Sequence, residues 1–74
     1  IGNNQNFNMK ITFNQSEFNL QGNTIDELLK ESNSDRDLGF VVMVNKKIVL
    51  KHHWGSHQLG EADIVQTILP VHGG

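Results

Sequence analysis

The residues with the clearest chemical meaning are the last two, Gly73 and Gly74. A Gly-Gly end suits a protein whose own C-terminal carboxylate is the reacting group. A carboxylate accepts a nucleophile at neutral pH only after activation, usually as an acyl-adenylate made from ATP in a partner's active site. Glycine has no Cβ, so it lets other backbones approach closely and tolerates strained dihedral angles in a narrow slot. We therefore predict that Gly74 carries the reacting carboxylate and that Gly73 is needed to deliver it.

The residues before the glycines are expected to present them to a partner. Pro70 fixes one φ angle and lacks a backbone donor, so it should end sheet pairing and stiffen the exit of the tail. The alternative is an edge proline without a role. His72 to Gly74 spans about 10 Å when extended, which is enough to enter a nucleotide pocket. His72 is either a contact to a phosphate in that pocket or simply a tolerated tail residue.

Other candidate reactive groups are weaker. His53 and His57 have the spacing of a metal-binding pair on a helix, but Gly55 lies between them and no carboxylate or cysteine completes the set. Asp35 and Asp37 have no base, nucleophile or metal partner, so they are read as loop surface. We expect no bound metal, and none of these groups forms the constellation of an enzyme active site.

Composition narrows the class of protein. The chain has 74 residues, enough for one small domain with a thin core. It has no cysteine, which fits a reducing compartment. The net charge of −2, with six Lys and Arg, argues against nucleic-acid binding. The longest apolar run, Phe40 to Val44, is too short to span a membrane, and no signal peptide is visible. The expected location is the cytoplasm.

The first half of the chain reads as a hairpin and a helix. Positions 1–8 are expected to be either a disordered extension or a remnant left by cloning, followed by a domain over 9–72 and the tail at 73–74. Apolar residues alternate with polar ones around Ile11 and again around Phe18, which predicts two strands joined by a turn. Thr24 and Glu27 then have the spacing of a capping box, the signature of a helix start.

The helix and the second half provide the core. Ile25, Leu28 and Leu29 share one helix face, and the helix should end near 32–34. The remaining elements are a strand at 40–44, a turn at 45–47, a strand from 48, an irregular segment at 51–60 and a last strand at 64–71. Within the irregular segment, Trp54 and Leu59 are the expected anchors.

This element order predicts an α+β fold of the ubiquitin-like β-grasp type, a small mixed sheet with one helix packed on one face. The first and last strands should be central and parallel, and the other face of the sheet should be bare. Apolar residues on a bare face indicate a docking surface. The alternative is that the segment at 51–60 covers them. The residues assigned to partner binding are Val42, Val44, Ile68, Pro70 and His72.

The order of these features resembles a known family, the ThiS-type sulfur carriers of thiamine thiazole synthesis. The resemblance covers Met9 to Gly74. The features that carry it follow the helix in this order: a strand leading into Val44-Asn45-x-x-Ile48-Val49, then Trp54, a turn ending in Asp63, a short strand and Gly73-Gly74.

The resemblance implies a carrier that catalyses nothing itself. In the family, a ThiF-type adenylating enzyme uses ATP to activate the terminal carboxylate, here that of Gly74. A sulfur donor, such as a cysteine desulfurase relay, then converts it to a thiocarboxylate. The thiocarboxylate gives its sulfur to a ThiG-type thiazole synthase. The carrier binds no cofactor, because ATP belongs to the partner.

Two departures from the family keep other functions open. The family usually has Gly-Asp before the last strand, whereas this chain has Ala62-Asp63, so the turn is expected to use different dihedral angles. The Pro70-Val71 pair is more like the tail of the small subunit of molybdopterin synthase, or of carriers for other sulfur pathways. Those molybdopterin subunits, however, usually have a longer segment between the helix and the third strand than the one at 33–38 here. A ubiquitin-like protein modifier is a further alternative, and so is a β-grasp binding module whose Gly-Gly is a truncation scar.

Overall fold

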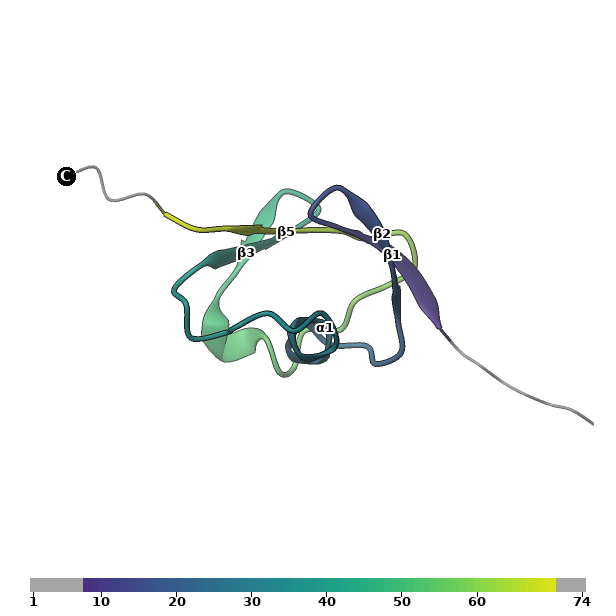
Figure 1. Ribbon diagram of the computed structural model, residues 1–74, viewed down its shortest axis with the longest axis horizontal. Helices are drawn as coiled ribbons and strands as arrows, with labels where there is room; N and C mark the ends of the chain where they lie inside the picture. Colours follow the sequence, from purple (N-terminus) through teal and green to yellow (C-terminus); the bar gives the residue numbers. More distant parts are fainter. Residues whose placement is uncertain (1–7, 71–74) are drawn as a thin grey trace, which may run out of the picture.

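The computed structural model describes residues 8–70 and contains one mixed sheet and one α-helix. The elements in chain order are β1 (Met9–Phe13), β2 (Ser16–Leu20), α1 (Ile25–Glu31), β3 (Val41–Val44), β4 (Lys47–Val49), the 3₁₀ turn η1 (Lys51–His53) and β5 (Ile64–Ile68). The strands lie in the order β2-β1-β5-β3-β4. β1 and β5 are parallel and the other neighbours are antiparallel. The predicted β-grasp arrangement is confirmed, with α1 beneath the sheet (Figure 1).

Both hairpins close through tight turns that begin with asparagine. Asn14 and Gln15 have φ values of 50° and 72°, and Asn45 and Lys46 have φ values of 51° and 72°. Two consecutive residues with positive φ match the right-handed twist of the flanking strands. Asparagine enters this region more readily than most residues, which explains its place at the first position of each turn. The second turn is one residue shorter than the predicted 45–47, because Lys47 already belongs to β4.

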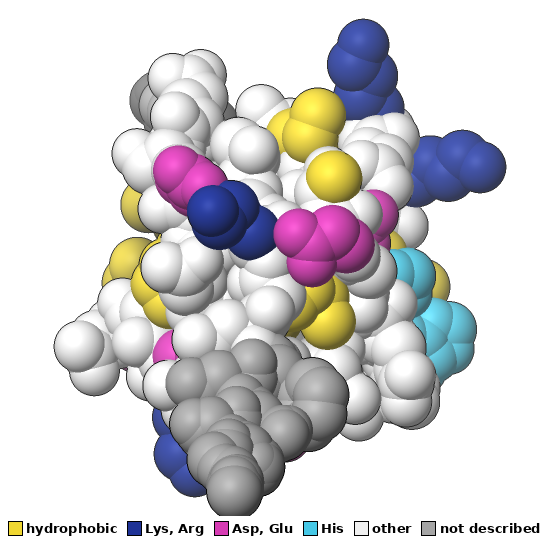
Figure 2. Space-filling model, turned by 90° about the vertical axis from the view of Figure 1, so that its right-hand side faces the viewer, with side chains coloured by type: hydrophobic (Ala, Val, Ile, Leu, Met, Phe, Trp, Pro, Cys, Tyr) yellow, Lys and Arg dark blue, Asp and Glu magenta, His cyan; other side chains and the backbone are white. Residues whose placement is uncertain are grey.

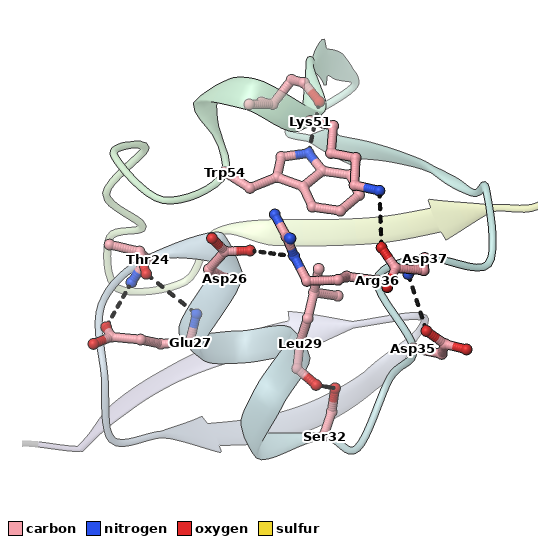
Figure 3. A network of polar contacts seen from close by, with 11 residues as sticks. Thr24, Asp26, Glu27, Leu29, Ser32, Asp35, Arg36, Asp37, Lys51 and Trp54 are labelled. Carbon is pink, nitrogen blue, oxygen red and sulfur yellow. Dashed lines mark hydrogen bonds and ion pairs between the residues drawn. The ribbon is translucent and has the colours of Figure 1, made fainter.

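The capping box at the start of α1 is present as predicted (Figure 3). The Glu27 backbone N–H donates to Thr24 Oγ1 at 3.2 Å, and Glu27 Oε1 accepts from the Thr24 N–H at 3.2 Å. The same carboxylate oxygen also accepts from the Asn23 N–H at 2.7 Å. These bonds satisfy donors that a helix start leaves without partners. The helix ends at Glu31, with Ser32 as its C-cap.

The hydrophobic core lies between α1 and the face of the sheet that it covers. The helix face that was predicted to be buried, formed by Ile25, Leu28 and Leu29, is part of this core. The buried core residues are Ile11, Leu20, Ile25, Leu28, Leu29, Val42, Val44, Trp54, Leu59 and Val65. Both anchors expected in the irregular segment, Trp54 and Leu59, are among them, so that prediction is confirmed.

Trp54 ties the irregular segment to the rest of the domain. Its Nε1–H donates to the Val49 carbonyl at 2.9 Å, and its ring stacks on Phe40 with centroids 5.7 Å apart. The Arg36 guanidinium lies 5.7 Å from the indole centroid and pairs with Asp26 at 3.0 Å. The indole N–H is therefore hydrogen-bonded, and its ring contacts both an aromatic ring and a guanidinium; Figure 3 shows Trp54 with Arg36 and Asp26 beside it.

The segment at 51–60 packs on the helix side of the sheet. The Asp26 N–H donates to the Trp54 carbonyl at 3.1 Å, and the Leu59 N–H donates to the Asn23 carbonyl at 2.7 Å. These bonds hold the segment beside the start of α1. It therefore does not cover the opposite face of the sheet, and the alternative in which it does is wrong.

Two strand ends differ from the prediction. β3 begins at Val41, because Phe40 leaves the sheet to stack on Trp54. β5 ends at Ile68, where its pairing with Val41 ends, so the pairing stops two residues before Pro70. Leu69 and Pro70, which were also predicted to lie in this strand, are outside it. Val71, the last residue of the predicted strand, lies outside the described residues.

Candidate docking face and tail exit

The register of β3 against β5 decides which side chains face the helix. Val44 lies opposite Val65 and Val42 lies opposite Thr67. Val42 and Val44 are 0% and 6% exposed and belong to the core. Their assignment to a partner-binding surface was therefore wrong, because side chains alternate along a strand and the register turns these two toward α1.

The opposite face is left open by the described elements, and half of it is apolar. Val41 and Met43 of β3 point to this side and are half-buried. Next to them Ile48 is 62% exposed, Ile64 is 50% exposed and Ile68 is 45% exposed. We call these five residues the open-face patch. Exposed β-branched side chains gathered on one face are unfavourable in water, and such a patch commonly marks an interaction surface.

The other half of the open face, over β1 and β2, is polar. Lys10 Nζ pairs with Glu17 at 3.2 Å, and Thr12 lies on the same side of β1. A shallow hollow of about 480 Å³ separates this half from Ile64, with Glu61 at its rim. Figure 2 shows basic and acidic side chains side by side next to hydrophobic ones on this side of the molecule. The face therefore offers a partner both apolar area and charges.

The open-face patch continues to the point where the described chain ends. Ile68 is the last residue of β5, and Leu69 and Pro70 after it are exposed. Two predicted docking residues, Ile68 and Pro70, thus lie at the surface as expected. Val71, His72, Gly73 and Gly74 lie outside the described residues, so their predicted roles stay predictions.

The asparagines of the two hairpin turns both bond to β5. Asn14 Oδ1 accepts from the Thr67 N–H at 2.8 Å, and its Nδ2 donates to Thr67 Oγ1 at 3.0 Å. Asn45 Oδ1 accepts from the Ile64 N–H at 3.0 Å, and its Nδ2 donates to Asp63 Oδ1 at 3.0 Å. From the sequence, both were predicted only as turn residues. An Asn at the start of a turn does not reveal a bond to a distant strand.

The turn before β5 is strained at Ala62, where φ is 71°. Its N–H donates to the Lys10 carbonyl at 2.9 Å, and the Gly60 N–H donates to Asp63 Oδ2 at 2.8 Å. Glycine adopts this left-handed region without a steric penalty, whereas alanine does not. Tertiary bonds therefore hold Ala62 in a conformation that a glycine would favour.

The weaker candidates remain apart from this face. The His52 and His53 rings lie 4.1 Å apart, both within the exposed 3₁₀ turn. Between residues 8 and 70 no three His, Cys, Asp or Glu side chains are grouped to hold a metal ion. Asp37 pairs with Lys51 at 3.2 Å, and its N–H donates to Asp35 Oδ1 at 3.0 Å, so both aspartates serve the surface loop. In the same part of the chain, no helix is long and apolar enough to cross a membrane.

Comparison with known proteins adds two findings. The sequence profile of the ThiS family matches residues 5–74. The fold is similar to the crystal structure of the thiamine biosynthesis protein ThiS from Geobacter metallireducens, with a TM-score of 0.77 and 19% sequence identity. That match covers 89% of this chain and 100% of the other. Among curated proteins, no sequence matches the chain.

Proposed function

The chain belongs to the ThiS family, and from this premise we propose that it is a sulfur carrier protein that serves thiazole formation in thiamine biosynthesis. The observation that carries the proposal is the family match, which runs to residue 74 and so includes Gly73-Gly74. The similar crystal structure is that of a thiamine biosynthesis protein, which supports the same pathway. The proposed role makes this chain a co-substrate, with the chemistry performed in partner enzymes.

In the proposed reaction, the Gly74 carboxylate attacks the α-phosphate of ATP held by a ThiF-type adenylating enzyme. Pyrophosphate leaves and an acyl-adenylate forms. The terminal sulfur of a donor persulfide, such as that of a cysteine desulfurase relay, then attacks the carbonyl, so that a C–S bond forms, the C–O bond to AMP breaks and AMP leaves. A thiol reductant cleaves the S–S bond of the resulting acyl disulfide and is itself oxidised to a disulfide with the donor sulfur. The resulting thiocarboxylate donates its sulfur to a ThiG-type thiazole synthase.

The geometry supports this role through the position of the open-face patch. Ile68 is both part of the patch and the last residue of β5. A partner that covers the patch therefore sits beside the start of the tail and is placed to receive Gly74. Glycine at positions 73 and 74 suits this passage, because a side chain there would crowd the slot or the carbonyl under attack.

Pyrophosphate exchange with a purified ThiF-type enzyme tests the proposal. The wild-type chain should promote exchange of labelled pyrophosphate into ATP, and Gly74→Ala should abolish or strongly slow it while the far-ultraviolet circular dichroism stays unchanged. Adding the sulfur donor and the thiazole synthase should then give sulfur transfer from the wild-type chain. Normal exchange with Gly74→Ala would show that glycine is not required at the reacting end, and absence of exchange with the wild-type chain would contradict the proposed adenylation.

A further inference from the structure

The tail follows β5 in the chain. The two strands beside β5, β3 and β1, pair with different lengths of it. On one side, β3 pairs with it up to Ile68. On the other side, β1 pairs with it only at Thr12↔Ile64 and Phe13↔Val65, after which the chain turns away into the first hairpin. The last part of β5 therefore lacks a strand on the β1 side.

The Asn14 side chain takes the place of that missing strand. The Asn14 N–H donates to the Val65 carbonyl at 2.9 Å. Two residues further along β5, the Thr67 N–H points to the same side, as the alternation of a strand requires, and donates to Asn14 Oδ1 at 2.8 Å. The Thr67 hydroxyl accepts from Asn14 Nδ2 at 3.0 Å. These are the last contacts on the β1 side before Pro70 among the described hydrogen bonds.

Asn45 makes the matching clamp at the other end of β5. Its N–H donates to the Ile64 carbonyl at 2.7 Å, and its Oδ1 accepts from the Ile64 N–H at 3.0 Å. Both asparagines open a turn with two positive φ angles, and both bond to β5 through backbone and side chain. They differ in place, because Asn14 holds the end next to the tail and Asn45 holds the end far from it.

We propose that Asn14 is a positioning residue for the C-terminal tail, acting through Thr67. This inference rests on the proposed carrier function. With Asn14 in place, β5 is held on both sides up to Thr67, so the tail starts from a fixed point when it enters the adenylating site. Without the Asn14 side chain, Thr67 loses these two hydrogen bonds, and β5 is held on that side only through the Val65 carbonyl and the pairs before it. A looser anchor lets the end of the chain sample more conformations, so the conformational entropy lost on binding is larger and Gly74 reaches its reactive position more slowly.

The test compares Asn14→Gly with Asn45→Gly. Glycine keeps the positive φ of each turn, so both variants should fold and lose only the side-chain bonds. Asn14→Gly should speed amide hydrogen exchange at Thr67 at least tenfold and lower kcat/KM for adenylation about tenfold. Asn45→Gly should have a similar effect on the free energy of unfolding but change kcat/KM less than about twofold. Asn14→Asp, which keeps the Oδ1 acceptor, should restore most of the rate.

The outcomes separate this inference from the proposed function. If Asn14→Gly and Asn45→Gly change kcat/KM equally, or if Asn14→Gly leaves it unchanged while exchange at Thr67 rises, Asn14 is structural only and the carrier function stands. If the wild-type chain is not adenylated by an enzyme that is active on its own carrier, both the proposed function and this inference are wrong.

Discussion

Val44 of β3 lies directly opposite Val65 of β5, and both side chains point toward α1. This one pair fixes the faces of both strands, because every second residue must follow it. It places Val42 in the core and leaves Val41, Met43 and Ile68 for the other side. The candidate docking face therefore follows from a register that joins residues 21 positions apart in sequence.

Ile68→Ala should weaken partner binding without weakening the fold. Ile68 is 45% exposed at the edge of the open-face patch, so truncating it removes little buried area from the free protein. We expect the free energy of unfolding to change by less than about 0.5 kcal/mol and KM for the carrier in adenylation to rise about fivefold or more. Leu38→Ala is the control, since Leu38 is also exposed but lies in the loop between α1 and β3. Equal KM values for the two variants would remove Ile68 from the docking face.

Val42→Ala should weaken the fold without weakening partner binding. Its side chain is fully buried against α1, so its loss leaves a cavity in the core. The free energy of unfolding should fall by about 2 kcal/mol. KM measured well below the unfolding temperature should stay near the wild-type value. Denaturant unfolding and adenylation assays check the two parts, and a raised KM with unchanged stability would return Val42 to the docking face.

Lowering the pH should reduce the free energy of unfolding, because the Glu27 carboxylate at the start of α1 becomes protonated. Hydrogen bonds from the Asn23 and Thr24 backbone lower the pKa of its carboxyl below the ordinary value. A carboxylate with a lowered pKa stabilises the fold above its unfolded pKa, about 4.3, and this contribution is lost as the pH falls through the folded value. Glu27→Gln should therefore reduce the loss of stability between about pH 5 and pH 3. Denaturant unfolding at several pH values measures it.

Glu17→Gln is the matched control for that series. It also removes one negative charge, but Glu17 is an exposed strand residue outside the capping box. If Glu17→Gln flattens the pH dependence as much as Glu27→Gln, the effect comes from net charge and the capping box is not its source.

Ala62→Gly should stabilise the domain slightly. An alanine at the φ of 71° found here costs about 1–2 kcal/mol of folding free energy, and glycine removes this cost. Glycine also makes the unfolded chain more flexible, which offsets part of the stabilisation. The expected net gain in the free energy of unfolding is about 0.5 kcal/mol. Ala62→Val should be destabilising, because a β-branched side chain fits this region poorly. A loss of stability in Ala62→Gly would show that the turn needs the alanine side chain.

Much of the fold follows from local patterns in the sequence. Alternation predicts β1 and β2, the Thr24–Glu27 spacing predicts the helix start, and the element order predicts which strands are central. The first two of these signals lie within a few residues, and the third needs only the order of the elements along the chain. The length of β5 could not be predicted in this way, because it depends on where its neighbours end.

The candidate site was predicted less well, for a physical reason. All four residues of β3 are apolar, so alternation cannot tell its two faces apart, and Val42 was assigned to the wrong one. The roles of Asn14 and Asn45 depend on bonds to residues about 20 to more than 50 positions away. Such bonds become visible only when the register of the sheet is known.

The most direct test of the carrier function is the intact mass of the chain, purified from its own cells, before and after incubation with ATP, the activating enzyme and a sulfur donor. If the chain is a sulfur carrier, its mass should shift by the difference between one sulfur and one oxygen, and fragmentation should locate the shift at Gly74. An unchanged mass, with a known carrier converted in the same assay, would contradict it.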